Sequence, residues 1–201
     1  MELLESQVFL YKEFKEGKVV FKDSVSTTGK LNYHRLFGQI LFINQKGDTL
    51  ALSKPETFDH VIIGTDTFFY YQKGYVQQLT HYPKFNLSLK QTLKYIGKEK
   101  KGAYGSYSAT TSVNSVSDLN VNEPEMTRLY KADENSVYTF NNQFFIADRF
   151  NNLFEASKKN IFDIFSRHEK EMKNYIRINK IDLGKQRDLE KLMAFVHSVD
   201  Q

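Results

Sequence analysis

Glycine-containing turns at short intervals constrain the first 82 residues of this chain more than any other feature. Gly17, Gly38, Gly47, Gly64 and Gly74 each separate short runs of apolar, aromatic or β-branched residues. Glycine supplies the positive φ that tight hairpins require, at no steric cost. Short strands with a turn about every eight to twelve residues are typical of an antiparallel meander. Such a sheet must curl, or pack on another element, to hide one face from water.

Composition favours the same structure. The 201 residues include 17 Phe and 12 Tyr but no Trp, and both types fit pleated, half-buried surfaces. We expect strands at residues 8–14, 19–21, 31–34, 40–43, 49–52, 61–63, 67–71 and 75–79. Residues 85–96 fit a strand through the alternation of Phe85, Leu87 and Leu89, or a helix through Leu89, Leu93 and Ile96. We favour a strand that continues the sheet.

A polar stretch follows the expected sheet. Residues 97–125 begin with Lys98, Lys100 and Lys101 and continue with Gly, Ser, Thr and Asn, few of which suit a core. A loop of this length is usually a functional flap or disordered, so we expect a mobile excursion, with preferential protease cutting at about residues 102–122. Beyond it, residues 137–140 and 143–147 are expected to form a hairpin, because Asn141-Asn142 tolerates the left-handed conformation of a two-residue turn.

The pattern becomes helical from Ser157, which is expected to cap a short helix. Ser166 and Glu169 match a capping box, which would open a second helix. A third helix carries an apolar stripe with the spacing i, i+3, i+4, i+7. Its members are Leu189, Leu192, Met193 and Val196.

Strands followed by helices predict an α+β fold. Residues 1–150 are expected to form an antiparallel, curled β-meander, sandwich- or barrel-like, that includes the mobile excursion at 97–125. Residues 151–201 are expected to form a cluster of about three short helices packed on that sheet. The apolar fraction of 40% and the charged fraction of 26% are those of an ordinary globular protein.

Charge and cysteine content limit the possible function classes. The net charge of +4 is mild and acidic residues are interspersed with basic ones, so no nucleic-acid partner is expected. Without Cys, the chain has no disulfide, thiolate nucleophile or Cys-based metal site. No apolar run approaches the roughly 18 residues that span a membrane, so no transmembrane segment is expected. Residues 1–5 lack the basic start and apolar core of a signal peptide.

No motif assigns a catalytic residue, a cofactor or a metal. The chain has no Gly-rich phosphate loop, no G-x-S-x-G and no H-E-x-x-H. Its five histidines are not arranged in zinc-ligand spacing. His34, His60 and His81 lie in or beside the expected sheet, and the sequence leaves open whether they converge. We expect neither a cofactor nor a metal.

Aromatic residues supply the candidate binding positions. Phe69 and Tyr71 would share one face of a strand whose other face carries Phe68 and Tyr70. A strand covered on both faces is the ordinary explanation, and an exposed aromatic ligand surface is the alternative. Tyr104 and Tyr107, flanked by Gly and Ser, have the composition of a binding loop. The candidate ligand-binding residues are therefore Tyr104, Tyr107, Phe69 and Tyr71.

Several stretches together carry a family likeness. They are residues 31–33, 47–52, 63–68 and 100–105, and in the tail 158–161, 175–177, 179–182 and 188–189. In these stretches the chain resembles uncharacterised exported proteins of Bacteroidota-type bacteria, over most of its length. The resemblance implies a periplasmic or cell-envelope location after removal of a signal peptide. It implies no activity, cofactor or site residue.

The expected function is binding without catalysis. The chain would be a periplasmic or surface binding or scaffold protein, whose partner is a small molecule, a peptide or an envelope protein. The alternative is a hydrolase or other enzyme with a site assembled from distant residues. An apolar pocket lined by acids or histidines with perturbed pKa values would favour the enzyme. A broad exposed aromatic face would favour the binding protein.

Overall fold

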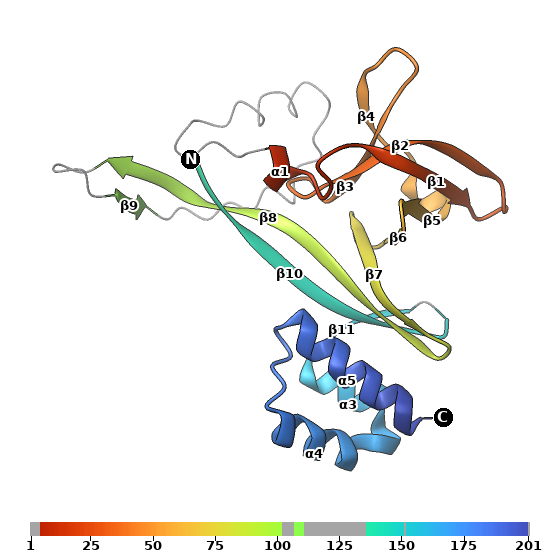
Figure 1. Ribbon diagram of the computed structural model, residues 1–201, viewed down its shortest axis with the longest axis vertical. Coiled ribbons are helices and arrows are strands. Elements are labelled where there is room, and N and C mark those ends of the chain that lie inside the picture. Colours follow the sequence, from red (N-terminus) through yellow and green to blue (C-terminus); the bar gives the residue numbers. More distant parts are fainter. Residues whose placement is uncertain (1–4, 102–106, 111–135, 151, 201) are drawn as a thin grey trace. The chain divides into compact units, whose positions relative to one another are not determined.

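The protein, described here from a computed structural model, pairs its strands antiparallel and carries helices near the C-terminus (Figure 1). This confirms the predicted α+β fold with a curled meander. The structure describes residues 5–101, 107–110, 136–150 and 152–200. The chain forms two compact units: Met1–Tyr75 with Gln91–Asn141, and Val76–Lys90 with Asn142–Gln201. Each unit is therefore assembled from stretches that are distant in the sequence.

The first unit contains a sheet in the order β6–β5–β1–β2–β3–β4. Its strands are β1 (Lys15–Phe21), β2 (Ser26–His34), β3 (Gln39–Ile43), β4 (Thr49–Ala51), β5 (Phe58–Ile63) and β6 (Asp66–Tyr70). The short helix η1 (Pro55–Thr57) precedes β5. Alternate residues of these strands point to one face and form a core. That core contains Val19, Leu31, Tyr33, Ile40, Phe58, Val61, Ile63, Phe68 and Tyr75.

The strand expected at residues 8–14 is wrong. The short helix α1 (Glu5–Val8) occupies its start, and Phe9 makes only an isolated bridge with His34. The buried side chain of Asn32 replaces further backbone pairing. Its Oδ1 accepts a hydrogen bond from the amide of Tyr11 (3.2 Å), and its Nδ2 donates to the carbonyl of Tyr11 (2.8 Å). A side chain of β2 thus satisfies the groups that a neighbouring strand would have used.

The turn expected at Gly17 is also wrong. Gly17 lies inside β1, directly opposite Gly29 of β2. The chain reverses after Phe21 instead, where Ser24 adopts a φ of 68° and its amide bonds the carbonyl of Phe21. Glycine therefore serves two purposes in this sheet. At Gly47 and Gly64 it supplies the positive φ of a turn, whereas at Gly17 it permits close backbone packing within a strand.

The second unit combines a sheet with the C-terminal helices. Its strand order is β11–β10–β8–β7. It contains residues 76–82 of β7 (Tyr75–Tyr82), residues 85–90 of β8 (Phe85–Lys101), residues 142–148 of β10 (Ser136–Asp148) and all of β11 (Leu153–Glu155). Residues 85–96 are thus strand, as predicted. The helices are α3 (Lys158–Ile164), η4 (Ser166–His168), α4 (Glu169–Asn179) and α5 (Gln186–Val199).

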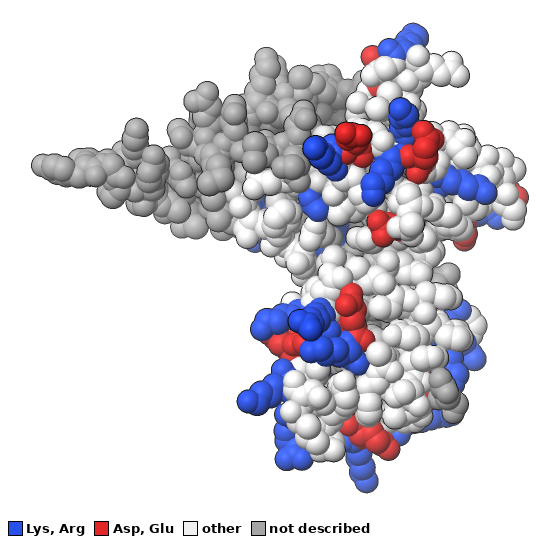
Figure 2. All heavy atoms as spheres, in the orientation of Figure 1, with Lys and Arg blue, Asp and Glu red and all other residues white. Residues whose placement is uncertain are grey.

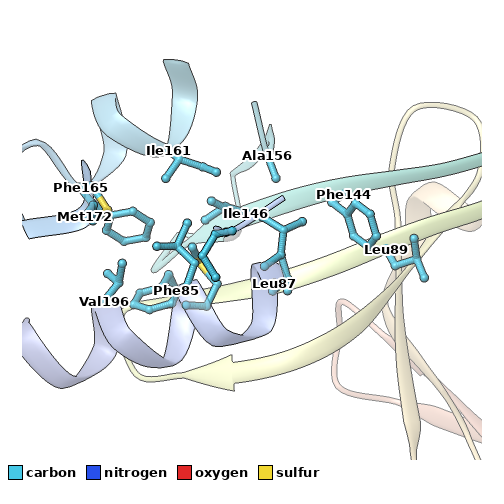
Figure 3. Close-up of a cluster of buried hydrophobic side chains, with 14 residues drawn as sticks. Phe85, Leu87, Leu89, Phe144, Ile146, Ala156, Ile161, Phe165, Met172 and Val196 are labelled. Carbon is cyan, nitrogen blue, oxygen red and sulfur yellow. The ribbon is translucent and has the colours of Figure 1, made fainter. Parts of the chain in front are cut away.

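The helices of this unit pack on its strands through one apolar cluster (Figure 3). The predicted stripe of α5 is fully buried in it, since Leu189, Leu192, Met193 and Val196 each have 0% exposure. Strand residues of the cluster are Phe85, Leu87, Leu89, Phe144 and Ile146. The helical tail is therefore part of a core that it shares with β8 and β10.

One of the two predicted helix caps is present. Ser157 caps α3, and its side chain accepts a hydrogen bond from the amide of Asn160 (3.2 Å). The capping box at Ser166 is wrong, because Ser166 lies within η4 and α4 begins at Glu169 without a side-chain cap. The amide of His168 bonds the carbonyl of Phe165, and this 3₁₀ turn joins the two helices without a separate cap.

The hairpin expected across Asn141-Asn142 is wrong, since β10 runs unbroken from Ser136 to Asp148. A two-residue hairpin turn requires positive φ at one or both central residues, and neither asparagine has it. The reversal occurs later, between β10 and β11. There the carboxylate of Asp148 accepts hydrogen bonds from the amides of Phe150 and Asn152.

The polar stretch at 97–125 contains two segments with regular structure. Strand β8 extends to Lys101, and β9 (Tyr107–Thr110) pairs with it from Lys101↔Tyr107 to Lys98↔Thr110. An edge pair of this kind needs backbone hydrogen bonds rather than apolar alternation, so the sequence pattern gave no sign of it. Residues 102–106 and 111–125 of the predicted excursion lie outside the described residues.

Candidate ligand pocket

A cavity of about 530 Å³ opens in the first unit, within the curl formed by β1, β2, β3 and the segment from β4 to β5. This volume is in the range of small-molecule sites, roughly 300–1,000 Å³. The residues that line it are Val19, Phe21, Thr27, Thr28, Gly29, Leu31, Phe42, Ile43, Asn44, Gln45, Leu52, Ser53, Lys54, Thr57 and Phe58.

Apolar side chains form the floor of the pocket. Val19, Leu31 and Phe58 are buried and belong to the core of this unit. The rings of Phe21 and Phe58 meet edge to face, with centroids 5.2 Å apart. This is a favoured aromatic geometry, and it fixes the wall where β1 and β5 meet.

The register of the sheet places the opposite wall. Leu31 on β2 is paired with Phe42 on β3, and Phe42 is paired with Leu50 on β4. The amide of Leu52 then donates to the carbonyl of Ile40 (3.0 Å), which holds the chain beside β3 after β4 has ended. Cross-strand partners point to the same face, so this register positions the apolar side chains of Leu31 and Phe42 over one cavity.

Polar residues surround the mouth. Thr27, Thr28, Gln45, Ser53 and Lys54 are all exposed. The combination of an apolar floor with a few polar groups at the opening is the usual arrangement of a small-molecule site.

Lys54 has an unusual backbone at this mouth. Its φ of 56° and ψ of 49° are left-handed, a conformation that non-glycine residues seldom adopt. Its carbonyl accepts hydrogen bonds from both the amide (3.0 Å) and the hydroxyl (2.8 Å) of Thr57. These bonds fix the backbone from which the lysine side chain projects.

Gly29 leaves the pocket open. It lies on β2 between Thr27 and Leu31, which share its face and line the same cavity. A Cβ added at Gly29 would meet no heavy atom within 4 Å. The absence of a side chain at this position therefore contributes directly to the free volume of the pocket.

The aromatic candidates from the sequence lie elsewhere. Phe69 is on β6 with its ring centroid 6.2 Å from that of His60, and Tyr71 follows β6, where its hydroxyl accepts from Gln72. Neither residue lines the pocket. Tyr107 lies in β9, and Tyr104 lies outside the described residues. A binding role for these four residues stays a prediction.

The histidines have separate surroundings. His34 is buried between Phe9 and Phe37, whereas His60 is partly exposed and lies 2.7 Å from the carboxylate of Asp59. His81, in the second unit, contacts Asn86 (2.7 Å). Within the described residues, no group of three or more His, Asp or Glu side chains is placed to hold a metal ion.

A second polar cluster lies beside the core of the first unit. The hydroxyl of Tyr11 donates to the carboxylate of Asp66, and the ammonium of Lys15 lies 4.0 Å from the centroid of the Tyr11 ring. Burial, together with the neighbouring Asp66 carboxylate, raises the pKa of the Tyr11 hydroxyl. Tyr11 therefore stays protonated and fixes the N-terminal segment to the start of β6.

On one face of the molecule, neither basic nor acidic side chains dominate the described surface. On the face drawn in Figure 2, the Lys and Arg side chains of the described residues are interspersed with Asp and Glu. Such interspersed charges are typical of an ordinary solvated surface. In the part of the chain that the structure describes, none of the helices combines the length and apolar character needed to cross a bilayer.

Sequence patterns contained part of the signal for this pocket. The alternation of Val19 and Phe21, and of Gly29 and Leu31, indicates which residues share a face. The contribution of Lys54 had no such signal, because a lysine before a proline is ordinary in a loop.

No protein-family model, no curated protein and no solved structure matches this chain.

Proposed function

We propose that this protein is a non-enzymatic binding protein that holds a small apolar ligand in the pocket bounded by β1, β2, β3 and β5. The observation that carries the proposal is the cavity of about 530 Å³ with an apolar floor. Burial of apolar ligand surface supplies roughly 25 cal/mol per Å², so a floor of Val, Leu and Phe side chains can retain such a ligand.

Paired strands form most of the pocket wall. At Gly17, β1 packs too closely against Leu31 and the backbone of Ile62 to leave room for a side chain. A pocket whose walls are held by backbone pairing loses little conformational entropy on binding, and this supports retention of a small molecule.

The chemistry of the lining supports binding over catalysis. Among the described residues that line the pocket there is no Asp, Glu or His. General acid–base catalysis relies mainly on these side chains, with pKa values adjusted by burial and neighbours. Lys54 is the one titratable lining residue in the described part of the chain, and it is exposed at the mouth.

The location of the protein forms a separate part of the proposal. We place it in the periplasm or cell envelope of the producing bacterium, on the resemblance of its sequence to exported proteins. Cell fractionation with an antibody against this chain tests the location. Recovery with a cytoplasmic marker would exclude it without affecting the binding proposal.

Ligand binding can be tested with a neutral apolar dye such as Nile red, whose emission rises in an apolar site. Gly29→Phe places a ring in the open space of the pocket, so we expect its affinity for the dye to fall about tenfold or more. Gly29→Ala adds only one methyl group and should retain most of the affinity. Lys30→Phe is the matched control, because Lys30 is exposed on the opposite face of the same strand.

The outcome that would overturn the proposal is equally specific. Equal dye binding by the native protein, Gly29→Phe and Lys30→Phe would show that the dye occupies another site. Circular dichroism of each variant verifies that the sheet is intact. A loss of dye binding in Lys30→Phe as large as in Gly29→Phe would also contradict a pocket-specific site.

A further inference from the structure

Resting on the proposed binding function, we infer that the ligand is an amphiphile with a single negative charge: its apolar body lies on the pocket floor and its anionic head pairs with the ammonium of Lys54 at the mouth. The basis is the charge of the lining. Lys54 is the one charged residue among the described residues that line the cavity, and no carboxylate is among them.

The ammonium of Lys54 is available for such a pairing. In the described part of the chain, none of the ion pairs or cation–π contacts involves Lys54. Lys46 is a useful contrast. It is exposed in the adjacent turn between β3 and β4 but does not line the cavity.

The backbone at Lys54 supports a role for its side chain. A left-handed residue in a turn is ordinarily Gly or Asn, because other residues adopt this conformation at a steric cost. Lys54 has φ 56° and is followed by Pro55, with its carbonyl fixed by Thr57. Ser24, Gln72, Lys73 and Lys180 adopt the same conformation away from the cavity, so at Lys54 it fixes the point from which the side chain projects and does not by itself indicate a ligand.

The distribution of apolar and polar residues around the cavity suits one head and one apolar body. The apolar floor extends from Phe42 and Leu52 to Phe58, and Lys54 follows Leu52 by two residues on the chain that forms the rim. Lysine is a point charge on a flexible stem, so it accepts a negative head without demanding a planar one. The hydroxyls of Ser53 and Thr27, also at the rim, are suitable donors to the head.

Three ten-carbon probes separate the contribution of charge from that of the apolar chain: decanoate, decanol and decyltrimethylammonium, each titrated below its micelle concentration by calorimetry. We expect decanoate to bind about tenfold or more tighter than decanol, and the cation to bind most weakly. Raised salt should weaken decanoate binding and leave decanol binding unchanged, because the ion pair lies at the exposed mouth.

Two lysine variants locate the charge effect. Lys54→Gln removes the ammonium and should abolish the preference for decanoate over decanol. Glutamine has a similar steric cost in the left-handed conformation, so the backbone is disturbed little. Lys46→Gln, the matched control, should retain it. If Lys54→Gln retains the preference, or if native protein binds decanol as tightly as decanoate, the inference is overturned and the apolar site itself stands.

Two further outcomes complete the test. If neither the ten-carbon probes nor the neutral dye binds, the proposed function fails together with the inference. If the protein instead sediments with vesicles of anionic phosphatidylglycerol while soluble decanoate does not bind, the charge at Lys54 serves a membrane surface and a free amphiphile is excluded.

Discussion

Gly17 and Gly29 lie opposite each other on β1 and β2, yet only Gly29 has space for a side chain. A Cβ at Gly17 would lie 2.6 Å from the carbonyl oxygen of Ile62 and 2.7 Å from Cδ1 of Leu31, whereas one at Gly29 would meet nothing within 4 Å. Close packing therefore requires the first glycine. The second leaves the cavity open and is not required by packing.

This contrast predicts opposite effects of the same substitution. Gly17→Ala forces the backbone of β5 or the side chain of Leu31 to move, and overpacking of this kind lowers the free energy of unfolding by about 1–3 kcal/mol. Gly29→Ala should raise it by about 0.5–1 kcal/mol, because alanine loses less conformational freedom than glycine in a strand. Urea unfolding of the two variants measures both changes. Equal destabilisation would contradict the assignment of free space to Gly29.

Leu192 on α5 should contribute strongly to the stability of the second unit. Its side chain has 0% exposure in the cluster shared by the helices and β8, so Leu192→Ala removes buried contacts and leaves a cavity. We expect the free energy of unfolding to fall by about 2–5 kcal/mol. Arg187→Ala, an exposed position of the same helix, is the control. A change near zero for Leu192→Ala would mean that α5 does not unfold with the strands.

The periodicity of the sequence predicted those elements whose burial follows a regular spacing. Leu189 and Val196 mark the buried face of α5, and Phe85 and Leu87 mark the buried face of β8. In each of these elements, apolar burial and local backbone preference favour the same structure. A sequence pattern predicts structure reliably when burial and local backbone preference agree in this way.

Predictions from local sequence patterns failed where a contact with a residue distant in the sequence determined the structure instead. Residues 8–14 look like a strand, but the Asn32 side chain satisfies the backbone of Tyr11. Gly17 looks like a turn residue, yet the approach of Ile62 explains its presence in β1. The pocket was missed for the same reason. Its walls come from separate strands and turns between residues 19 and 58, whose shared face depends on the register of pairing, and contacts of Thr57 hold the backbone of Lys54.

Asp200 should stabilise the second unit in a pH-dependent way. Its carboxylate lies 3.2 Å from both Nζ of Lys84 and Nε2 of His168. Burial raises the pKa of the Asp200 carboxyl, but the hydrogen bonds from Lys84 and His168 outweigh burial and hold that pKa below its ordinary value. The stabilisation is therefore complete above the pKa of an unfolded Asp, about 3.9, and is lost as pH falls through the lower folded value.

Thermal unfolding of Asp200→Asn tests this link. We expect a lower melting temperature than that of the native protein at pH 7, and a smaller difference at an acidic pH below about 3.9, where the native carboxyl also begins to be protonated as the pH falls through its lowered pKa. A difference that is the same at both pH values would show that Asp200 acts through packing, and its charge would then have no measurable role.

His34 should make the first unit lose stability as the pH falls. This loss should begin at a higher pH than the loss that Asp200 causes in the second unit. Its ring stacks on Phe37 with centroids 4.3 Å apart, and Nδ1 accepts a hydrogen bond from the amide of Phe37 (3.3 Å). Burial lowers the pKa of His34 from 6.5 to about 3, against the opposing effect of a backbone hydrogen bond of His34 itself. The folded protein therefore keeps this ring neutral at pH values where the unfolded chain binds a proton.

The sign of the effect follows from that difference in proton uptake. The contribution of His34 to stability is complete above about pH 6.5, falls as the pH decreases, and reaches its minimum below about pH 3, with a slope of at most about 1.4 kcal/mol per pH unit.

His34→Phe keeps an aromatic ring between Phe9 and Phe37 but cannot be protonated. It should lower the free energy of unfolding at pH 7, because the amide of Phe37 loses its acceptor. Between pH 6 and pH 4, however, the native protein should lose stability more steeply than the variant, so the two curves converge. Denaturant titrations at pH 7, 6, 5 and 4 measure this slope, and parallel curves would show that His34 does not govern the acid sensitivity of the first unit.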